Sequence, residues 1–309
     1  MATLFRPFKW IFIHSWRLLN FSRQLILNLL FLFLVLVVIV AVTKEEPKAK
    51  VQEGALVLDL SGNLVESPST TPSSGKLLQQ WLAGDERPTE TVVSDVVYAL
   101  NRAKQDPHIK GVVLDLSELQ GGGIAKLMQI TAALDDFRQS RKPVVAIGDF
   151  YAQHQYLLAA HADKILMDPN GAVILQGLGL YNYYFKSALA KFNITPYVFR
   201  VGTYKSFVEP YTRDNMSDEA REANSRWLGQ MWDEYVSNVA NSRKIAKDVV
   251  SPGKEQLLER LKAVAGDAAQ YALKQKLVDQ LATRNEQHQF IAKFAGSDNN
   301  DAGFRGVGL

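Results

Sequence analysis

The longest apolar run of the sequence constrains this chain more than any other feature. From Leu25 to Val42 it reads LILNLLFLFLVLVVIVAV, in which only Asn28 is polar. A membrane-spanning helix needs about 20 mostly apolar residues, each adding ~1.5 Å of length. A core helix of a soluble protein normally keeps a polar face, which this run lacks. The sequence therefore predicts a transmembrane anchor over residues 25–43.

A cleavable signal peptide is the alternative interpretation of the same run. The apolar region of a signal peptide normally spans about 7–15 residues and ends in a site of the A-x-A type. Here the apolar run is longer, and it ends in VAVTKEE. The anchor is therefore the favoured interpretation.

Positive charge is concentrated before the anchor. Residues 1–24 contain four basic residues and no acidic one, so the net charge of +3 leaves a sum of −1 for the rest of the chain. The positive-inside rule places this basic segment in the cytoplasm. We therefore expect a single-pass protein of the bacterial inner membrane with a periplasmic body. A body that bound nucleic acid would carry the basic excess itself, so the lipid bilayer is an expected partner and nucleic acid is not.

Beyond the anchor, short apolar runs alternate with amphipathic stretches. A polar segment at 44–54 is expected to link the anchor to a body over residues 55–295. Continuous apolar runs of this kind are typical of buried parallel strands. They are ALVLDL (55–60), GVVLDL (111–116), VVAIG (144–148), KILMD (164–168), AVILQG (172–177) and TPYVFRVG (195–202). The alternation predicts an α/β fold with a mostly parallel sheet covered by helices.

The pattern changes to a long amphipathic helix from Ser217 onward. Its apolar residues recur at spacings of three and four, as in Ala220, Ala223, Trp227, Met231 and Tyr235. Such a stripe normally forms core or a subunit interface. Shorter helices are expected near 151–161, 183–191, 254–263, 267–276 and 285–294, and residues 296–309 read as a linker.

The residue types give little sign of metal or cofactor chemistry. The chain has no cysteine, which excludes disulfides and thiolate metal sites. His154 and His161 would be ~10.5 Å apart along a helix, too far for one ion, and no H-E-x-x-H motif occurs. GTYKS at 202–206 lacks the glycine that precedes the lysine of a phosphate loop. We therefore expect neither a metal nor a cofactor.

Two local features leave functional alternatives open. Gly121–Gly123 follows an apolar run and opens a helical pattern, where backbone N–H groups can face an anion; the alternative is a tight turn.

No G-x-S-x-G motif marks a nucleophile. A lysine acts as a general base only where its environment lowers its pKa from ~10.4 by roughly three units. Lys205 follows an apolar run between Tyr204 and Phe207; the alternative is a surface lysine whose stem covers apolar groups.

A longer block narrows these alternatives by resemblance. Residues 199–235, FRVGTYKSFVEPYTRDNMSDEAREANSRWLGQMWDEY, resemble the N-terminal half of the signal peptide peptidase A (protease IV) family in its long tandem form. WRLLNF (16–21), LDLSG (58–62) and the stretch from VVLDL to KILMDP extend the likeness. It implies a crotonase/ClpP-like spiral fold and a serine peptidase of the Ser-Lys type that degrades cleaved signal peptides. It further implies a homo-oligomer whose subunits have two homologous halves, with the lysine on the first and the serine on the second.

Residue by residue, the resemblance gives one match and one departure. Lys205 matches the position of the catalytic lysine. The nucleophile-bearing half of the family has a motif of the A-S-G-G-Y type, whereas this chain reads AQHQY at 152–156, with Gln153 in place of the serine. A glutamine amide cannot act as the nucleophile.

Two hypotheses follow from this departure. In the first, which we favour, the chain supplies Lys205 as general base to a serine on a second half-domain, and residues 296–309 lead toward that half. In the second, the chain is a catalytically inactive, membrane-anchored homologue that binds peptides or partner subunits. An acyl-CoA enzyme on the same fold is disfavoured, because acyl-CoA is cytosolic and the body is expected outside the cytosol.

Overall fold

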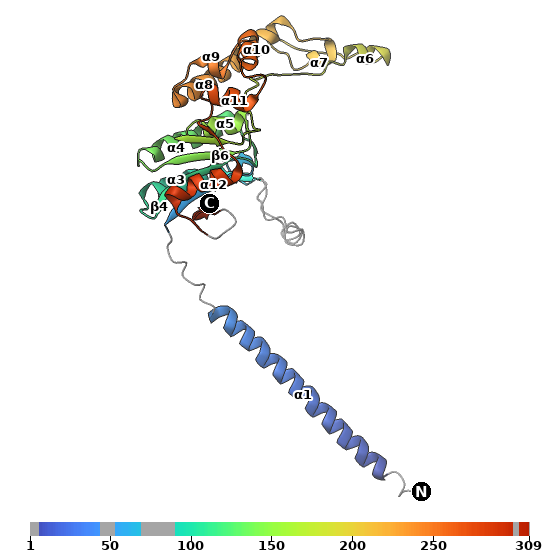
Figure 1. Ribbon diagram of the computed structural model, residues 1–309. Helices are drawn as coiled ribbons and strands as arrows, with labels where there is room; N and C mark the ends of the chain where they lie inside the picture. Colours follow the sequence, from blue (N-terminus) through green and yellow to red (C-terminus); the bar gives the residue numbers. More distant parts are fainter. Residues whose placement is uncertain (1–5, 44–52, 69–89, 299–302, 309) are drawn as a thin grey trace. The chain divides into compact units, whose positions relative to one another are not determined.

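The computed structural model of the protein describes residues 6–43, 53–68, 90–298 and 303–308 (Figure 1). The chain divides into two compact units, Met1–Gln52 and Glu53–Leu309, and each is described by itself. Most of the expected linker at 44–54, together with residues 299–302 and 309 of the expected C-terminal linker, lies outside the described residues.

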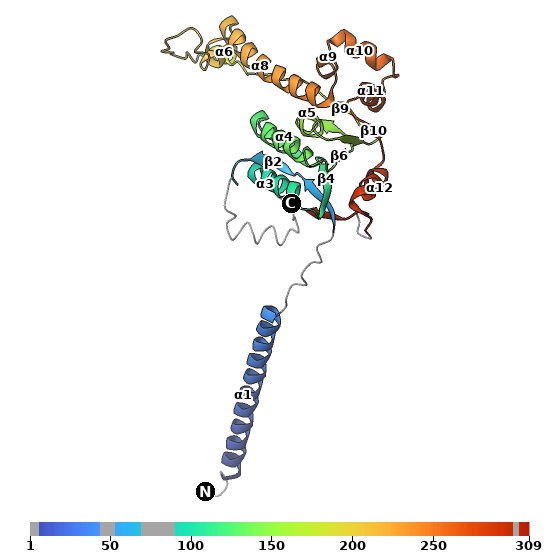
Figure 2. The same cartoon turned by 90° about the vertical axis from the view of Figure 1, so that its left-hand side faces the viewer.

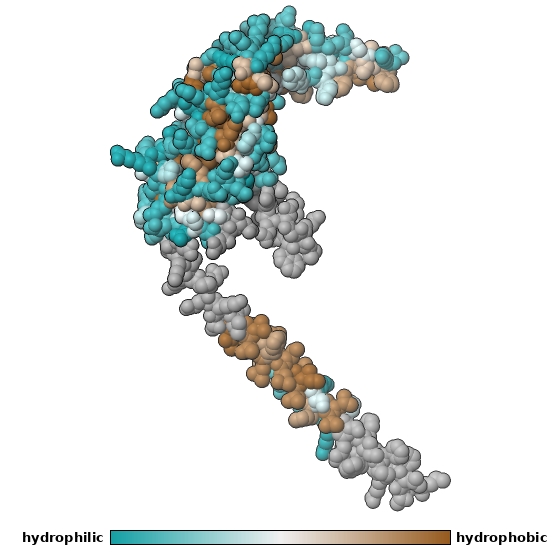
Figure 3. Space-filling view, in the orientation of Figure 1, coloured by the Kyte–Doolittle hydropathy of each residue, from teal (hydrophilic) through white to brown (hydrophobic). Residues whose placement is uncertain are grey.

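The first unit contains one long helix, α1 (Arg6–Thr43). Within it, Trp16–Ile39 is long and apolar enough to cross a membrane. Its apolar side chains are exposed on every side, and Figure 3 shows the apolar surface running along the helix. The expected single N-terminal apolar helix is therefore confirmed. A helix without a polar face is stable in lipid rather than in water.

The second unit, which we call the body, repeats one structural motif along the chain. Each repeat consists of a core strand, one or two short strands and a helix. The first repeat is β1 (Gly54–Asp59), β2 (Gly62–Val65), β3 (Glu90–Val92) and α3 (Val93–Gln105); the second is β4 (Ile109–Asp115), β5 (Leu119–Gly121) and α4 (Ile124–Arg138); the third is β6 (Val144–Gly148), β7 (Tyr151–Ala152) and α5 (Gln153–Ala159). A fourth begins with β8 (Lys164–Met167) and β9 (Val173–Ile174).

The core strands form one parallel sheet in the order β10-β8-β6-β4-β1-β11, where β10 is Gln280–Leu281 and β11 is Gly306–Gly308. The short strands pair separately, as β3-β2-β5 and β7-β9, and these pairs are also parallel. Successive repeats thus wind as a spiral, with core strands in one layer and short strands in another. This arrangement confirms the expected α/β fold of the crotonase/ClpP-like class.

Both faces of the main sheet are covered, which explains the continuous apolar runs. One face packs against α3 and α4, so that Val112 and Leu114 of β4 join the larger core cluster. On the other face, Val113 packs with residues of α12 (Arg284–Ala295) such as Ile291. Neighbouring residues in the middle of β4 therefore meet different helices, and both are buried.

The remaining helices follow the fourth repeat. They are α6 (Lys186–Lys191), α7 (Glu209–Thr212), α8 (Asp218–Arg243), α9 (Lys247–Val250), α10 (Lys254–Lys262) and α11 (Ala268–Lys274). The long helix expected from Ser217 is present, and the Ser217 hydroxyl caps it by accepting from the Ala220 N–H at 3.1 Å. Only the second half of α8 packs into the core, through Tyr235, Val236, Val239 and Ala240.

Residues 178–216 project from the body together with the first turns of α8, as Figures 1 and 2 show; we call this segment the arm. The strand expected at 195–202 is not present in it. Tyr197, Phe199 and Val201 are 85%, 98% and 92% exposed, so no neighbouring strand or core holds this run in the described structure. The expected strand at 172–177 is likewise reduced to Val173–Ile174.

Candidate active site

The start of α5 is the position where the resemblance places a nucleophile, and Gln153 is its first residue. The side-chain oxygen Oε1 of Gln153 accepts hydrogen bonds from the backbone N–H groups of Gln176, at 3.0 Å, and Gly177, at 2.9 Å. Its amide Nε2 donates to the carbonyl oxygen of Gly177 at 3.2 Å. The side chain is therefore engaged with the backbone that follows β9, and it presents no nucleophile.

The next two residues attach α5 to the short strand β5. His154 Nε2 lies 2.8 Å from the Leu119 carbonyl oxygen, and Gln155 Nε2 donates to the same oxygen at 3.1 Å. Gln155 also accepts from the Ala152 N–H at 2.7 Å through Oε1. Since Leu119 begins β5, the structure brings the AQHQY segment next to the strand that runs into the glycine run.

The glycine run itself has a packing explanation at its middle residue. A Cβ atom on Gly122 would lie 2.6 Å from Cβ of Leu64 on β2, so a side chain there would force the strands apart. A Cβ on Gly123, the N-cap of α4, would meet nothing within 4 Å. The tight-turn alternative thus accounts for Gly122, and a role of the run in binding an oxyanion stays a prediction.

Lys205 lies in the arm, on an exposed turn between residues 202 and 208. The Arg200 guanidinium holds its backbone by donating to the Lys205 carbonyl oxygen at 2.7 Å. Tyr204 next to it contacts Glu222 of α8, with 3.4 Å between the hydroxyl and Oε2. Within the part of the chain that the structure describes, the Lys205 ammonium group makes no hydrogen bond or ion pair. The structure therefore does not join Lys205 to a serine or to the start of α5.

The base of the arm is held by a residue that sequence reasoning missed. Glu209, at the start of α7, is 4% exposed, and its carboxylate accepts hydrogen bonds from the backbone N–H of Ser217 at 3.1 Å and from its hydroxyl at 2.5 Å. Burial disfavours ionisation, but these two hydrogen bonds, with Arg213 and Arg200 nearby, outweigh it and lower the pKa of Glu209. No sequence motif marks this pair, because the carboxylate precedes its partner by eight residues.

The lowered pKa of Glu209 predicts a pH-dependent stability of the arm. The ionised carboxylate contributes its full stabilisation above about pH 4.5, the pKa of a glutamate in the unfolded chain. This stabilisation is lost as the pH falls from there through the lowered pKa of Glu209 in the folded protein. We expect Glu209→Gln to lower the melting temperature at pH 7 by a few degrees and to flatten its fall below pH 4.5. Thermal melts of both proteins from pH 7 to pH 3 test this, with Glu255→Gln on exposed α10 as control. Parallel curves for wild type and Glu209→Gln would refute the assignment.

His161 could be mistaken for part of a Ser-His-Asp triad. This histidine is 2% exposed, and its ring nitrogens lie 2.8 Å from Asp135 Oδ1 and 2.7 Å from Asn238 Oδ1. The hydroxyl of Ser242 lies 3.2 Å from both ring nitrogens. A hydroxyl equally distant from both lies over the ring face, because in the ring plane it would collide with the carbon between them. His161 therefore joins α4, α5 and α8 as a packing residue.

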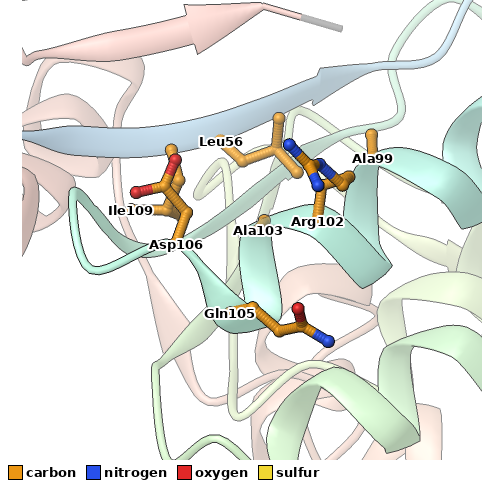
Figure 4. Close-up of a pocket in the computed structure, with 7 residues that line it drawn as sticks. All are labelled: Leu56, Ala99, Arg102, Ala103, Gln105, Asp106 and Ile109. Carbon is orange, nitrogen blue, oxygen red and sulfur yellow. The ribbon is translucent and has the colours of Figure 1, made fainter. Parts of the chain in front are cut away.

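Two further features of the described part of the body give no catalytic group. The cavity in Figure 4, of about 380 Å³, lies between β1 and α3, with Arg102 and Asp106 as its charged lining residues. It contains none of the predicted site residues. Among the described residues, no group of three or more histidine, aspartate or glutamate side chains could hold a metal ion.

Comparison with known proteins relates the chain to a peptidase family. The family described as peptidase family S49 matches residues 136–295. Protease 4 of Salmonella typhi is 41% identical over 99% of this chain and 50% of its own length, and Protease 4 of Haemophilus influenzae is 39% identical over 91% of this chain and 46% of its own. The chain thus spans about half the length of the curated relatives it matches. Among solved structures, an enoyl-CoA hydratase/isomerase family protein from Silicibacter pomeroyi is 15% identical, with a TM-score of 0.40 over 79% of both chains.

Proposed function

Since this chain belongs to peptidase family S49, we propose that it supplies the lysine general base of a membrane-bound serine peptidase that degrades signal peptides. The observation that carries the proposal is the environment of Gln153, whose side chain is bound to the backbone of Gln176 and Gly177. The position that would hold a serine offers no nucleophile, while Lys205 matches the catalytic lysine of the family. The serine is therefore supplied by a second half-domain.

The proposed reaction uses Lys205 as both base and acid. The neutral amine takes the proton from the serine hydroxyl as its oxygen attacks the scissile carbonyl, and the resulting ammonium donates that proton to the leaving amine. An acyl-enzyme remains; a water molecule then gives a proton to Lys205 and attacks the acyl carbon. The Lys205 ammonium returns that proton to the departing serine oxygen, which releases the carboxylic acid product. In this proposal the second half-domain covers Lys205, because a lysine general base needs surroundings that exclude water.

We place the enzyme in the bacterial inner membrane, with residues 1–24 in the cytoplasm and the body in the periplasm. The support is the apolar run from Leu25 to Val42, within a helix apolar enough to cross a membrane, and the basic residues Arg6, Lys9, Arg17 and Arg23, which all precede this run. A cleaved signal peptide is apolar and lies in or near the bilayer. Anchoring the peptidase there keeps its substrate within reach.

We further propose that the arm is buried in the assembled enzyme, against the second half-domain and neighbouring subunits of a homo-oligomer. Its exposed large apolar side chains are Leu180, Tyr181, Tyr183, Phe185, Phe192, Ile194, Tyr197, Phe199, Val201, Tyr204, Phe207 and Tyr211. A soluble monomer rarely exposes an apolar patch of this extent, and aromatic residues are enriched in interfaces.

The alternative function is that of a catalytically inactive homologue that binds peptides or partner subunits. The occupied Gln153 side chain favours it as well, because a chain without a nucleophile cannot cut by itself. The two functions differ in whether a serine-bearing half exists.

The mass of the native protein distinguishes these functions. We expect an antibody against residues 199–235 to detect, in membranes of the source organism, a band at about twice the 34.5 kDa of this chain. The recombinant 309-residue chain, run beside it, gives the reference position. A native band at 34.5 kDa would contradict a tandem subunit and would favour the binding function or a serine on a separate polypeptide.

A further inference from the structure

Gln153 connects the two ends of the arm, and it does so with different atoms. Its side chain binds the residues where the chain enters the arm, and its backbone carbonyl binds the helix that leaves it. We infer that Gln153 is a positioning residue for Lys205, which fixes the arm on the body at both ends. This inference rests on the proposed function in one respect only, namely that Lys205 is the base being positioned.

The entry to the arm is held by three hydrogen bonds from one side chain. Oε1 of Gln153 accepts from the N–H groups of Gln176 and Gly177, and Nε2 donates to the Gly177 carbonyl. Gly177 has a φ of +81°, the left-handed region that favours glycine, so the chain turns sharply at this point. The direction in which the arm leaves the body is therefore set at Gly177, and Gln153 satisfies both backbone groups of that residue.

The exit from the arm is held by Tyr235 of α8. Its hydroxyl donates to the Gln153 carbonyl oxygen at 2.8 Å, and its side chain is 2% exposed. The Trp232 ring stacks on the Tyr235 ring, with 4.9 Å between centroids and 8° between planes. This contact fixes the rotation and axial position of α8 relative to α5. The first turns of α8 continue into the arm, where Glu222 meets Tyr204 beside Lys205.

Hydrogen bonds within the arm connect its segments, so that a movement at either end displaces the whole arm. Phe185 N–H donates to the Pro210 carbonyl oxygen at 2.6 Å, and Ser187 N–H donates to Asp214 Oδ1 at 3.0 Å. Glu209 binds Ser217 at the start of α8. A change at either end is therefore transmitted to the turn that carries Lys205. A displacement of about 1 Å in a catalytic group can cost on the order of a hundredfold in rate.

A glutamine meets the needs of this site better than its closest analogues. The entry to the arm requires an oxygen that accepts two hydrogen bonds and, on the same side-chain group, a nitrogen that donates one. A glutamate would keep the two acceptor contacts but would place a second carboxylate oxygen against the Gly177 carbonyl. An alanine would remove all three hydrogen bonds and leave the backbone bond to Tyr235 in place.

Hydrogen exchange and kinetics of the complete, membrane-extracted enzyme test the inference. We expect Gln153→Ala to speed exchange of the Gln176 and Gly177 amides and of residues 178–216 about tenfold, with β4 and β6 unchanged. Gln153→Glu should lie between Gln153→Ala and wild type. Peptide turnover should show kcat reduced at least tenfold and KM within twofold, because the base moves while peptide binding stays. Gln256→Ala, at an exposed glutamine of α10, is the control and should change neither quantity.

Several outcomes separate this inference from the proposed function. Unchanged exchange in the arm of both Gln153 variants would overturn the inference, as would faster exchange with an unchanged kcat in an enzyme that Lys205→Ala inactivates. Should Gln153→Ala fail to fold, Gln153→Glu removes fewer contacts and should give the same changes at a smaller size. Tyr235→Phe removes only the contact at the exit, so it should speed exchange in residues 178–216 and leave the Gln176 and Gly177 amides unchanged. If Lys205→Ala retains turnover, the proposed function fails, and the exchange rates still decide whether Gln153 holds the arm.

Discussion

Replacing Lys205 with alanine in the complete enzyme is expected to abolish peptide hydrolysis, lowering kcat at least about a thousandfold. The fold should be unaffected, because the ammonium group makes no hydrogen bond or ion pair with any described residue. Lys205→Arg should be equally inactive, since a guanidinium keeps its proton at any working pH and cannot accept one from a serine. The arginine variant retains charge and length, so its loss of activity isolates the proton transfer.

A matched lysine makes this experiment specific. Lys191, at the end of α6, is also an exposed lysine of the arm, and Lys191→Ala should keep turnover within twofold of wild type. Circular dichroism and melting temperature of all variants establish that folding is intact. More than a tenth of the wild-type kcat in Lys205→Ala would show that another group acts as the base.

Placing two aspartates in the arm is expected to dissociate the assembled enzyme. Phe199 and Val201 are 98% and 92% exposed in this chain, and we propose that they are buried between subunits. Burying such side chains is worth about 1.5–3 kcal/mol each, and burying an unpaired carboxylate in their place costs more. Phe199→Asp combined with Val201→Asp should therefore weaken assembly by at least about a hundredfold, since each 1.4 kcal/mol is a factor of ten.

Sedimentation velocity of the detergent-extracted protein measures this effect as a loss of mass. The control is Leu258→Asp on α10, an apolar side chain that is 47% exposed and lies outside the arm. It should leave the mass unchanged. An unaltered mass of the doubly substituted protein would show that the arm is not the assembly surface.

Most core strands could be predicted from the sequence because the signal that marks each strand lies within the strand itself. The strands β1, β4, β6 and β8 lie within one or two residues of the expected runs. The middle of each strand is buried on both faces, so it is a continuous apolar run, and that signal is local. Ser217 likewise marks the start of α8, because a capping serine acts on its own helix.

The predictions failed where the partner of a segment is distant in the sequence or is not found among the described residues. The run at 195–202 has the composition of a strand, but composition indicates only that a segment will be buried, not against what. Residues 306–308, expected in a linker, form β11 because they pair with β1, and only the folded structure reveals so distant a partner. The hydrogen bonds of Gln153 were equally inaccessible, since they depend on the turn at Gly177, far along the chain. Lys205 was raised as a candidate by its apolar surroundings in the sequence, only the resemblance favoured it over a surface lysine, and its role stays a prediction.

The strand order of the main sheet has a consequence for how the body folds. The strands β1, β4, β6, β8 and β10 are laid down side by side in the order of their synthesis, so each can pair as it emerges. The strand β11 is the exception: Gly306 must return to Ala55, a contact of high sequence separation and therefore slow to form. Until then β1 keeps an open edge available to other extended chains. The pairing of β11 with β1 is thus a late step in the folding of the body.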